Sequence, residues 1–82
     1  MSQISLEEIK SMTMSYAIMM WHKRQAYQIS TPIEIHVAHI RNRFETSLWA
    51  RRIEQVFQEL VQTHPYFRFN ESAILEYFPQ SK

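Results

Sequence analysis

Residues 31–63 read TPIEIHVAHIRNRFETSLWARRIEQVFQELVQT and predict two helices joined by a short polar turn. The first of these helices is expected to begin with Thr31 as N-cap and Pro32 at its first position, with Glu34 completing a capping box. Its apolar residues recur at helical spacing and are Ile33, Val37, Ile40 and Phe44. Helices so close in sequence pack at a steep angle, which leaves the outer side of the second helix exposed.

The second of these helices combines an apolar face with a face of arginine and glutamine. Glu45, Thr46 and Ser47 form the expected turn, with Ser47 as N-cap, and the helix stops by His64. The predicted buried face consists of Trp49, Ile53, Val56, Phe57 and Leu60. The opposite face carries Arg51, Gln55, Gln58 and Gln62, with Arg52 beside them. Such side chains can pair with guanine and adenine in a DNA groove, although they also suit an ordinary solvated helix.

An earlier helix is expected from about residue 5 to Tyr27. Ser5 and Glu8 have the spacing of a capping box. The apolar residues that follow at helical spacing are Ile9, Met12, Tyr16, Met19, Met20 and Tyr27. Apolar side chains also extend beyond a single stripe, which indicates burial on more than one side. The residues assigned to this second side are Met14, Ile18 and Trp21. They are expected to contact either a second subunit, in a homodimer, or the C-terminal segment of the same chain.

The C-terminal segment has two possible structures. Residues 66–69 alternate as a strand does, and residues 74–78 are rich in strand-forming side chains, with a polar turn at residues 70–72. This pattern predicts a β-hairpin, and hence a mainly α fold with a small C-terminal hairpin, in one domain covering residues 1–82. Alternatively, Asn70 caps a short fourth helix, which would make the protein an all-α four-helix bundle.

Composition excludes several functional classes. The 82 residues include no cysteine and no glycine, so disulfides, thiolate metal sites and glycine-rich phosphate loops cannot form. The most apolar run, residues 12–21, is too short to span a bilayer, and we expect a cytoplasmic protein without membrane contact. The net charge is only +1, but residues 41–52 contain four arginines and a single glutamate.

Histidines and carboxylates show no pattern of a metal or catalytic site. His36 and His39 are close enough on a helix to share an ion, but the further ligands of a structural zinc site are not evident. The acidic residues are all glutamates, placed at helix starts or on polar faces, and no nucleophile motif is present. We therefore expect neither an enzyme nor a cofactor.

Three helices with a tight turn before the third, followed by a hairpin, resemble the winged helix-turn-helix domains. Residues 28–34 are similar to the short strand that leads into the second helix of that family. The resemblance implies a transcriptional regulator that binds double-stranded DNA, usually with the third helix in the major groove. Arg51, Arg52, Gln55 and Gln58 would then face bases and phosphates. Arg41, Arg43 and Ser47 would reach the backbone, while the hairpin touches flanking DNA.

The methionines of the first helix are the basis for a second possible class of function. Met12, Met14, Met19 and Met20 lie near Tyr16 and Trp21 and could form an adaptable apolar surface for a protein partner. The protein would then be a helical interaction module or adaptor that does not contact DNA. Filling gaps in a small core explains Met12 and Met19 equally well.

Overall fold

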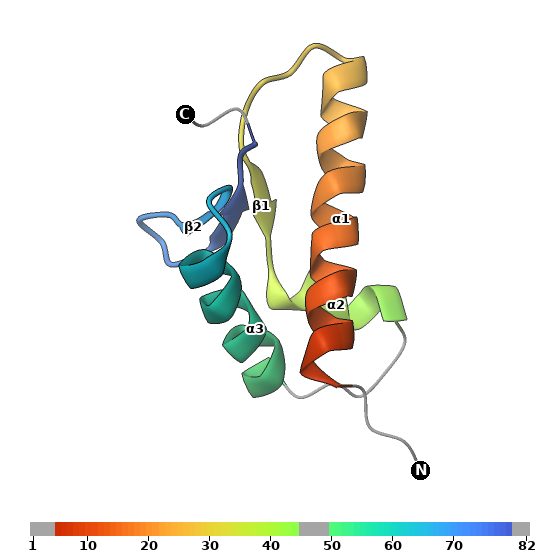
Figure 1. Cartoon of the computed structure of the whole chain (residues 1–82). Helices are drawn as coiled ribbons and strands as arrows, with labels where there is room; N and C mark the ends of the chain where they lie inside the picture. The colour runs from red at the N-terminus through yellow and green to blue at the C-terminus, as the bar shows by residue number, and fades with distance from the viewer. Residues whose placement is uncertain (1–4, 45–49, 80–82) are drawn as a thin grey trace.

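The computed structural model describes residues 5–44 and 50–79. In this part of the chain, three helices and three strands follow one another (Figure 1). They are α1 (Leu6–Ala26), β1 (Ile33–Ile35), α2 (Val37–Phe44), α3 (Ala50–Thr63), β2 (Phe67–Phe69) and β3 (Leu75–Tyr77). The protein is therefore mainly helical, with a small antiparallel sheet in the strand order β1-β3-β2.

The C-terminal segment forms the predicted hairpin, and the four-helix alternative is wrong. β2 pairs antiparallel with β3, and Phe67 lies opposite Tyr77. Phe67, Leu75 and Tyr77 are buried, whereas Arg68 is exposed and Glu76 is largely covered on the other face of the sheet. Apolar side chains alternate with polar ones here, and alternation places them on one face of a strand, whereas a helix would distribute them over several faces.

α1 begins and ends where the sequence predicts. The side chain of Ser5 accepts a hydrogen bond from the Glu8 amide, and the Glu8 carboxylate accepts one from the Ser5 amide. The helix ends at Ala26, with Tyr27 as its C-cap. None of the helices in the described ranges combines the length and the apolar character that crossing a membrane requires.

The buried line along α1 differs from the predicted apolar stripe. It consists of Ile9, Thr13, Ala17 and Trp21, each four residues after the last. The Thr13 hydroxyl donates a hydrogen bond of 2.8 Å to the Ile9 carbonyl, so burial leaves no donor unsatisfied. The Trp21 ring packs edge-on against Phe78, with 5.9 Å between ring centroids. The C-terminal segment of the same chain therefore covers this part of α1.

α2 begins later than predicted, and the capping box of Thr31 and Glu34 does not form. The chain instead forms β1 at this point, where Ile33 and Ile35 are each 1% exposed while Glu34 between them is exposed. Burial of two isoleucines and pairing with β3 stabilise the strand more than a local cap stabilises a helix turn. The Thr31 side chain, which was predicted to cap the helix, instead accepts a hydrogen bond from Arg24.

α3 has the predicted buried face. Ile53, Val56, Phe57 and Leu60 lie in the core, and the helix ends at Thr63. Trp49, also predicted for this face, lies outside the described residues. α1 contacts α3 and β1, and α3 contacts β2, so the core lies between the helices and one face of the sheet (Figure 1).

Candidate nucleic-acid interface

α3 presents a ridge of polar side chains on the side opposite the core. We call this the α3 ridge, and it consists of Arg51, Gln55, Gln58 and Gln62, all exposed. Their spacing of four, three and four residues places them along one face of the helix. The ridge was predicted from the sequence, because the same periodicity that buries one face of α3 exposes the other.

The positive charge of the ridge lies at the start of α3. Arg51 is exposed and forms no ion pair with any group in residues 5–44 or 50–79. Arg52, predicted beside it, is half-buried and already interacts with another group of the chain. The structure thus leaves Arg51 more accessible to a ligand than Arg52.

One of the two glutamates on α3 is neutralised by α1. The ammonium nitrogen of Lys10 lies 2.5 Å from Glu59 Oε1. This hydrogen bond raises the pKa of Lys10 above its usual value and so favours the charged ammonium. Glu54, by contrast, is exposed and has no cationic partner in the described part of the chain.

The arginines predicted to reach the DNA backbone are only partly described. Arg41 is exposed on α2, and α2 contacts α3. Arg43 also belongs to α2, but its side chain is outside the described part of the structure. Ser47 lies outside it altogether. The proximity of Arg43 and Ser47 to the α3 ridge therefore stays a prediction.

The hairpin offers no free cation to a DNA phosphate. Arg68 is the only lysine or arginine in residues 66–78. Its Nε donates a hydrogen bond of 3.1 Å to Glu76 Oε1, and its guanidinium lies 5.8 Å from the centre of the Phe78 ring. Glu71 is exposed in the turn. These charges disfavour contact between the hairpin and DNA phosphates.

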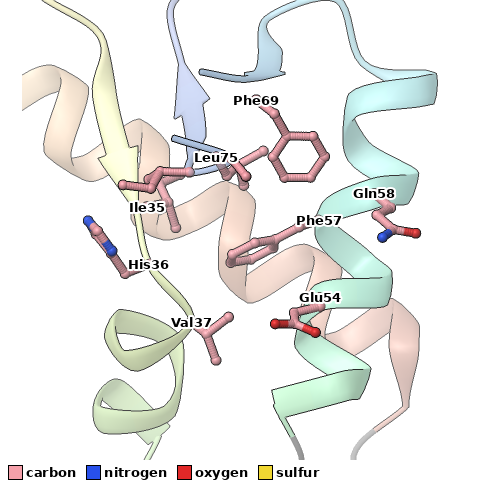
Figure 2. Close-up of a pocket in the computed structure, with 10 residues that line it drawn as sticks. Ile35, His36, Val37, Glu54, Phe57, Gln58, Phe69 and Leu75 are labelled. Carbon is pink, nitrogen blue, oxygen red and sulfur yellow. The ribbon is translucent and has the colours of Figure 1, made fainter. Parts of the chain in front are cut away.

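A groove of about 460 Å³ lies between α3 and the hairpin, and sequence reasoning missed it (Figure 2). We call it the hairpin groove. Its apolar lining includes Ile35, Val37, Phe57, Phe69, Ile74 and Leu75. Glu54 and Gln58 of α3 also line it. The apolar pair Phe69 and Ile74 on either side of the turn was a sequence signal, but nothing local showed that α3 would form the opposite wall.

The three α1 residues assigned to a partner surface lie in different environments. Trp21 belongs to the core and is 9% exposed. Met14 is half-buried and packs against that core. Ile18 is 41% exposed, which makes it the member of the set that a second subunit could reach. The predicted interface is therefore reduced to Ile18 and the accessible part of Met14.

The two histidines of the metal hypothesis lie at the start of α2. Their ring centroids are 5.1 Å apart, and His36 Nε2 is 3.8 Å from Glu34 Oε1. Within the described ranges, no three His, Cys, Asp or Glu side chains are grouped so as to hold a metal ion. His39 instead has a structural role, because its Nδ1 accepts a hydrogen bond of 3.2 Å from the His36 amide.

No family model, no curated protein and no solved structure matches this chain. Its function is therefore inferred from its own surfaces, which are the α3 ridge, the hairpin groove and the exposed side of α1.

Proposed function

We propose that the protein is a small DNA-binding regulator of the winged-helix type that reads the major groove with α3. The observation that carries the proposal is the exposed α3 ridge, where Arg51 is followed by three glutamines. Arginine pairs bidentately with guanine, and glutamine with adenine. The order of the elements supports this assignment, because a strand precedes the second helix and a hairpin follows the third, as in winged-helix domains.

Charge limits the proposed contact to the side of α2 and the start of α3. Arg41 and Arg51 are exposed there, whereas the hairpin carries Glu71 and an ion-paired Arg68. If each of the four arginines in residues 41–52 neutralised one phosphate, the logarithm of affinity would fall with the logarithm of salt concentration with a slope of about −4 per subunit. A steeper slope would require contacts beyond these arginines.

The proposal includes a homodimer formed through α1 and a cytoplasmic location. Ile18 supports the dimer because it exposes apolar surface on α1, away from the core. Two copies would present two α3 ridges to half-sites about 34 Å apart on one side of the duplex. The absence of cysteine from the sequence supports a reducing compartment.

Duplex binding by an Arg51→Ala variant tests the proposal. The natural site is unknown, so the probe is a duplex enriched from a random-sequence pool by the wild-type protein. We expect the variant to bind this duplex about tenfold more weakly, because a bidentate pair to guanine contributes about 1–3 kcal/mol. If Arg51 contacts a phosphate instead, the salt slope should decrease by about one.

The matched control is Lys23→Ala, which removes an exposed positive charge from the last turn of α1. It should leave both the affinity and the salt slope unchanged. Failure to enrich any duplex, or equal losses in the two variants, would contradict DNA reading by α3. Binding to other proteins with no dependence on salt would instead favour the interaction module.

A further inference from the structure

The hairpin groove is chemically unlike the α3 ridge, although the two surfaces share Gln58. Phe69 is 39% exposed in the groove, and Val37 and Ile74 are half-buried. Figure 2 shows Phe57 and Phe69 near one another, contributed by α3 and the hairpin. A volume of about 460 Å³ falls within the usual range for pockets that hold a ligand. The groove is therefore large enough to receive apolar side chains from outside the chain.

Glu54 gives the groove a charge preference. It is exposed on α3 and lines the groove, and Figure 2 shows it on the wall opposite Val37. Two other carboxylates of the described chain are matched by cations, Glu59 by Lys10 and Glu76 by Arg68. Glu54 has no such partner in residues 5–44 or 50–79. A bound segment with a lysine or arginine at this position would supply the missing charge.

The same carboxylate disfavours DNA in the groove. A phosphate placed between α3 and the hairpin would approach the negatively charged side chain of Glu54 in the groove wall. The apolar side chains that line the groove, chiefly Phe69 and Ile74, would offer that phosphate no hydrogen bonds. Apolar anchors with charged residues around them are instead typical of the centre and rim of protein interfaces.

We propose that the hairpin groove binds a short segment of another protein, in which apolar anchor residues adjoin a lysine or arginine that pairs with Glu54. The anchors would pack against Phe57 and Phe69, and the basic residue would lie at the mouth of the groove. This interaction does not depend on DNA binding, because its determinants are Glu54 and the apolar lining rather than Arg51.

A charge exchange tests the proposal in the full-length protein. The probes are two labelled synthetic peptides, an amphipathic peptide of leucine and lysine and its counterpart with glutamate in place of lysine. The wild type is expected to prefer the lysine peptide, and Glu54→Lys should reverse the preference, changing the ratio of the two dissociation constants about tenfold. Glu71→Lys is the matched control, because Glu71 is an exposed carboxylate of the turn that does not line the groove.

A second pair of variants tests the contribution of the apolar lining of the hairpin groove. Phe69→Ser should weaken binding of the lysine peptide about tenfold, whereas Ile18→Ser should not, although both side chains have similar exposure at 39% and 41%. Circular dichroism verifies that each variant is folded. Should Glu54→Lys unfold the protein, Glu54→Gln replaces it and is expected to abolish the preference between the peptides.

The proposal is overturned if Glu54 and Glu71 variants change the peptide preference equally, or if Phe69→Ser and Ile18→Ser bind alike. It is also overturned if Phe69→Ser abolishes self-association of the protein, since the groove would then hold a second copy. Duplex binding by the Glu54 variants is measured in parallel. An unchanged peptide preference in the Glu54 variants contradicts only the groove proposal, and a wild type that shows the preference but binds no duplex contradicts only the DNA proposal.

Discussion

Asn70 organises the hairpin turn through both ends of its side chain. Its Oδ1 accepts hydrogen bonds from the Ser72 amide at 2.8 Å and the Ile74 amide at 3.0 Å. Its Nδ2 donates to Glu76 Oε2 at 3.1 Å and to Glu34 Oε2 at 3.4 Å, which ties the turn to β3 and β1. Ala73 adopts a φ of 61°, a conformation that glycine usually supplies, in a chain without glycine. The Asn70 side chain therefore stabilises a turn with an unfavourable backbone angle.

Asn70→Ala is expected to reduce the free energy of unfolding by about 1–3 kcal/mol. The substitution removes the acceptor of two turn amides. It also removes the side-chain donor shared by Glu34 and Glu76, so the repulsion between these two carboxylates is no longer compensated. Urea denaturation measures the change. Asn42→Ala, at an exposed position of α2, is the control and should stay within about 0.5 kcal/mol of the wild type. Equal effects at the two asparagines would show that Asn70 does not hold the turn.

At the scale of elements, the start of α2 depends on a histidine. His36 precedes the helix, and His39 accepts the hydrogen bond from its amide, the part usually taken by glutamate or glutamine in a capping box. The His39 ring also packs against Tyr16 of α1, with 5.4 Å between centroids. Burial, and secondarily the charge of His36, lowers the pKa of His39 below its ordinary value of 6.5.

This cap should make stability depend on pH. The folded pKa of His39 is lower than the unfolded one, so the unfolded state binds more protons as the solution is acidified. The stabilisation is fully present above about pH 6.5 and is lost as pH falls through the window between 6.5 and the lowered folded value. Protonation also converts Nδ1 from an acceptor into a donor and removes the cap.

His39→Gln tests the pH dependence. Glutamine can accept the same hydrogen bond but does not titrate, so we expect a flatter profile of stability between about pH 5 and pH 8 than in the wild type. Denaturation midpoints measured across this range give the profile. His22→Gln, at an exposed position of α1, should keep the wild-type profile. A His39→Gln protein whose stability falls with acidification as steeply as the wild type would exclude His39 as the source.

At the scale of the whole molecule, the protein has three surfaces of different chemistry, two of which adjoin on α3. The α3 ridge is polar and basic at one end, the hairpin groove is apolar with a free carboxylate, and α1 exposes Ile18. The molecule measures 43 × 24 × 20 Å, and the 21 residues of α1 cover about 32 Å of its height (Figure 1). A dimer through α1 would leave the α3 ridge and the hairpin groove accessible.

Ile18→Glu is expected to make the protein monomeric if the dimer forms through α1. A charge placed in an apolar contact loses its hydration without gaining a partner, which opposes association. Sedimentation at tens of micromolar compares the variant with the wild type, for which we expect a dimer. Ile29→Glu is the matched control, because Ile29 is 44% exposed but lies after α1. A monomeric wild type, or a dimer that persists in Ile18→Glu, would contradict the proposed interface.

Sequence alone determined the elements whose signals are local. The capping box of Ser5 and Glu8 located the start of α1, and the apolar period of α3 predicted which side chains would be exposed on its ridge. Alternation around residues 66–78 predicted the hairpin. These features depend on residues a few positions apart, so a single stretch of sequence contains their whole cause.

Only the tertiary structure decided the features that join distant segments. Ile33 suits a helical stripe with Val37 and Ile40 until β3 provides a strand with which Ile33 and Ile35 can pair. Trp21 becomes a core residue because Phe78 packs against it, and Glu59 gains an ion-pair partner because Lys10 of α1 lies beside it. The hairpin groove likewise requires α3 and the hairpin to face each other. Local sequence could not predict these contacts, because burial and pairing energies depend on which segments meet in space.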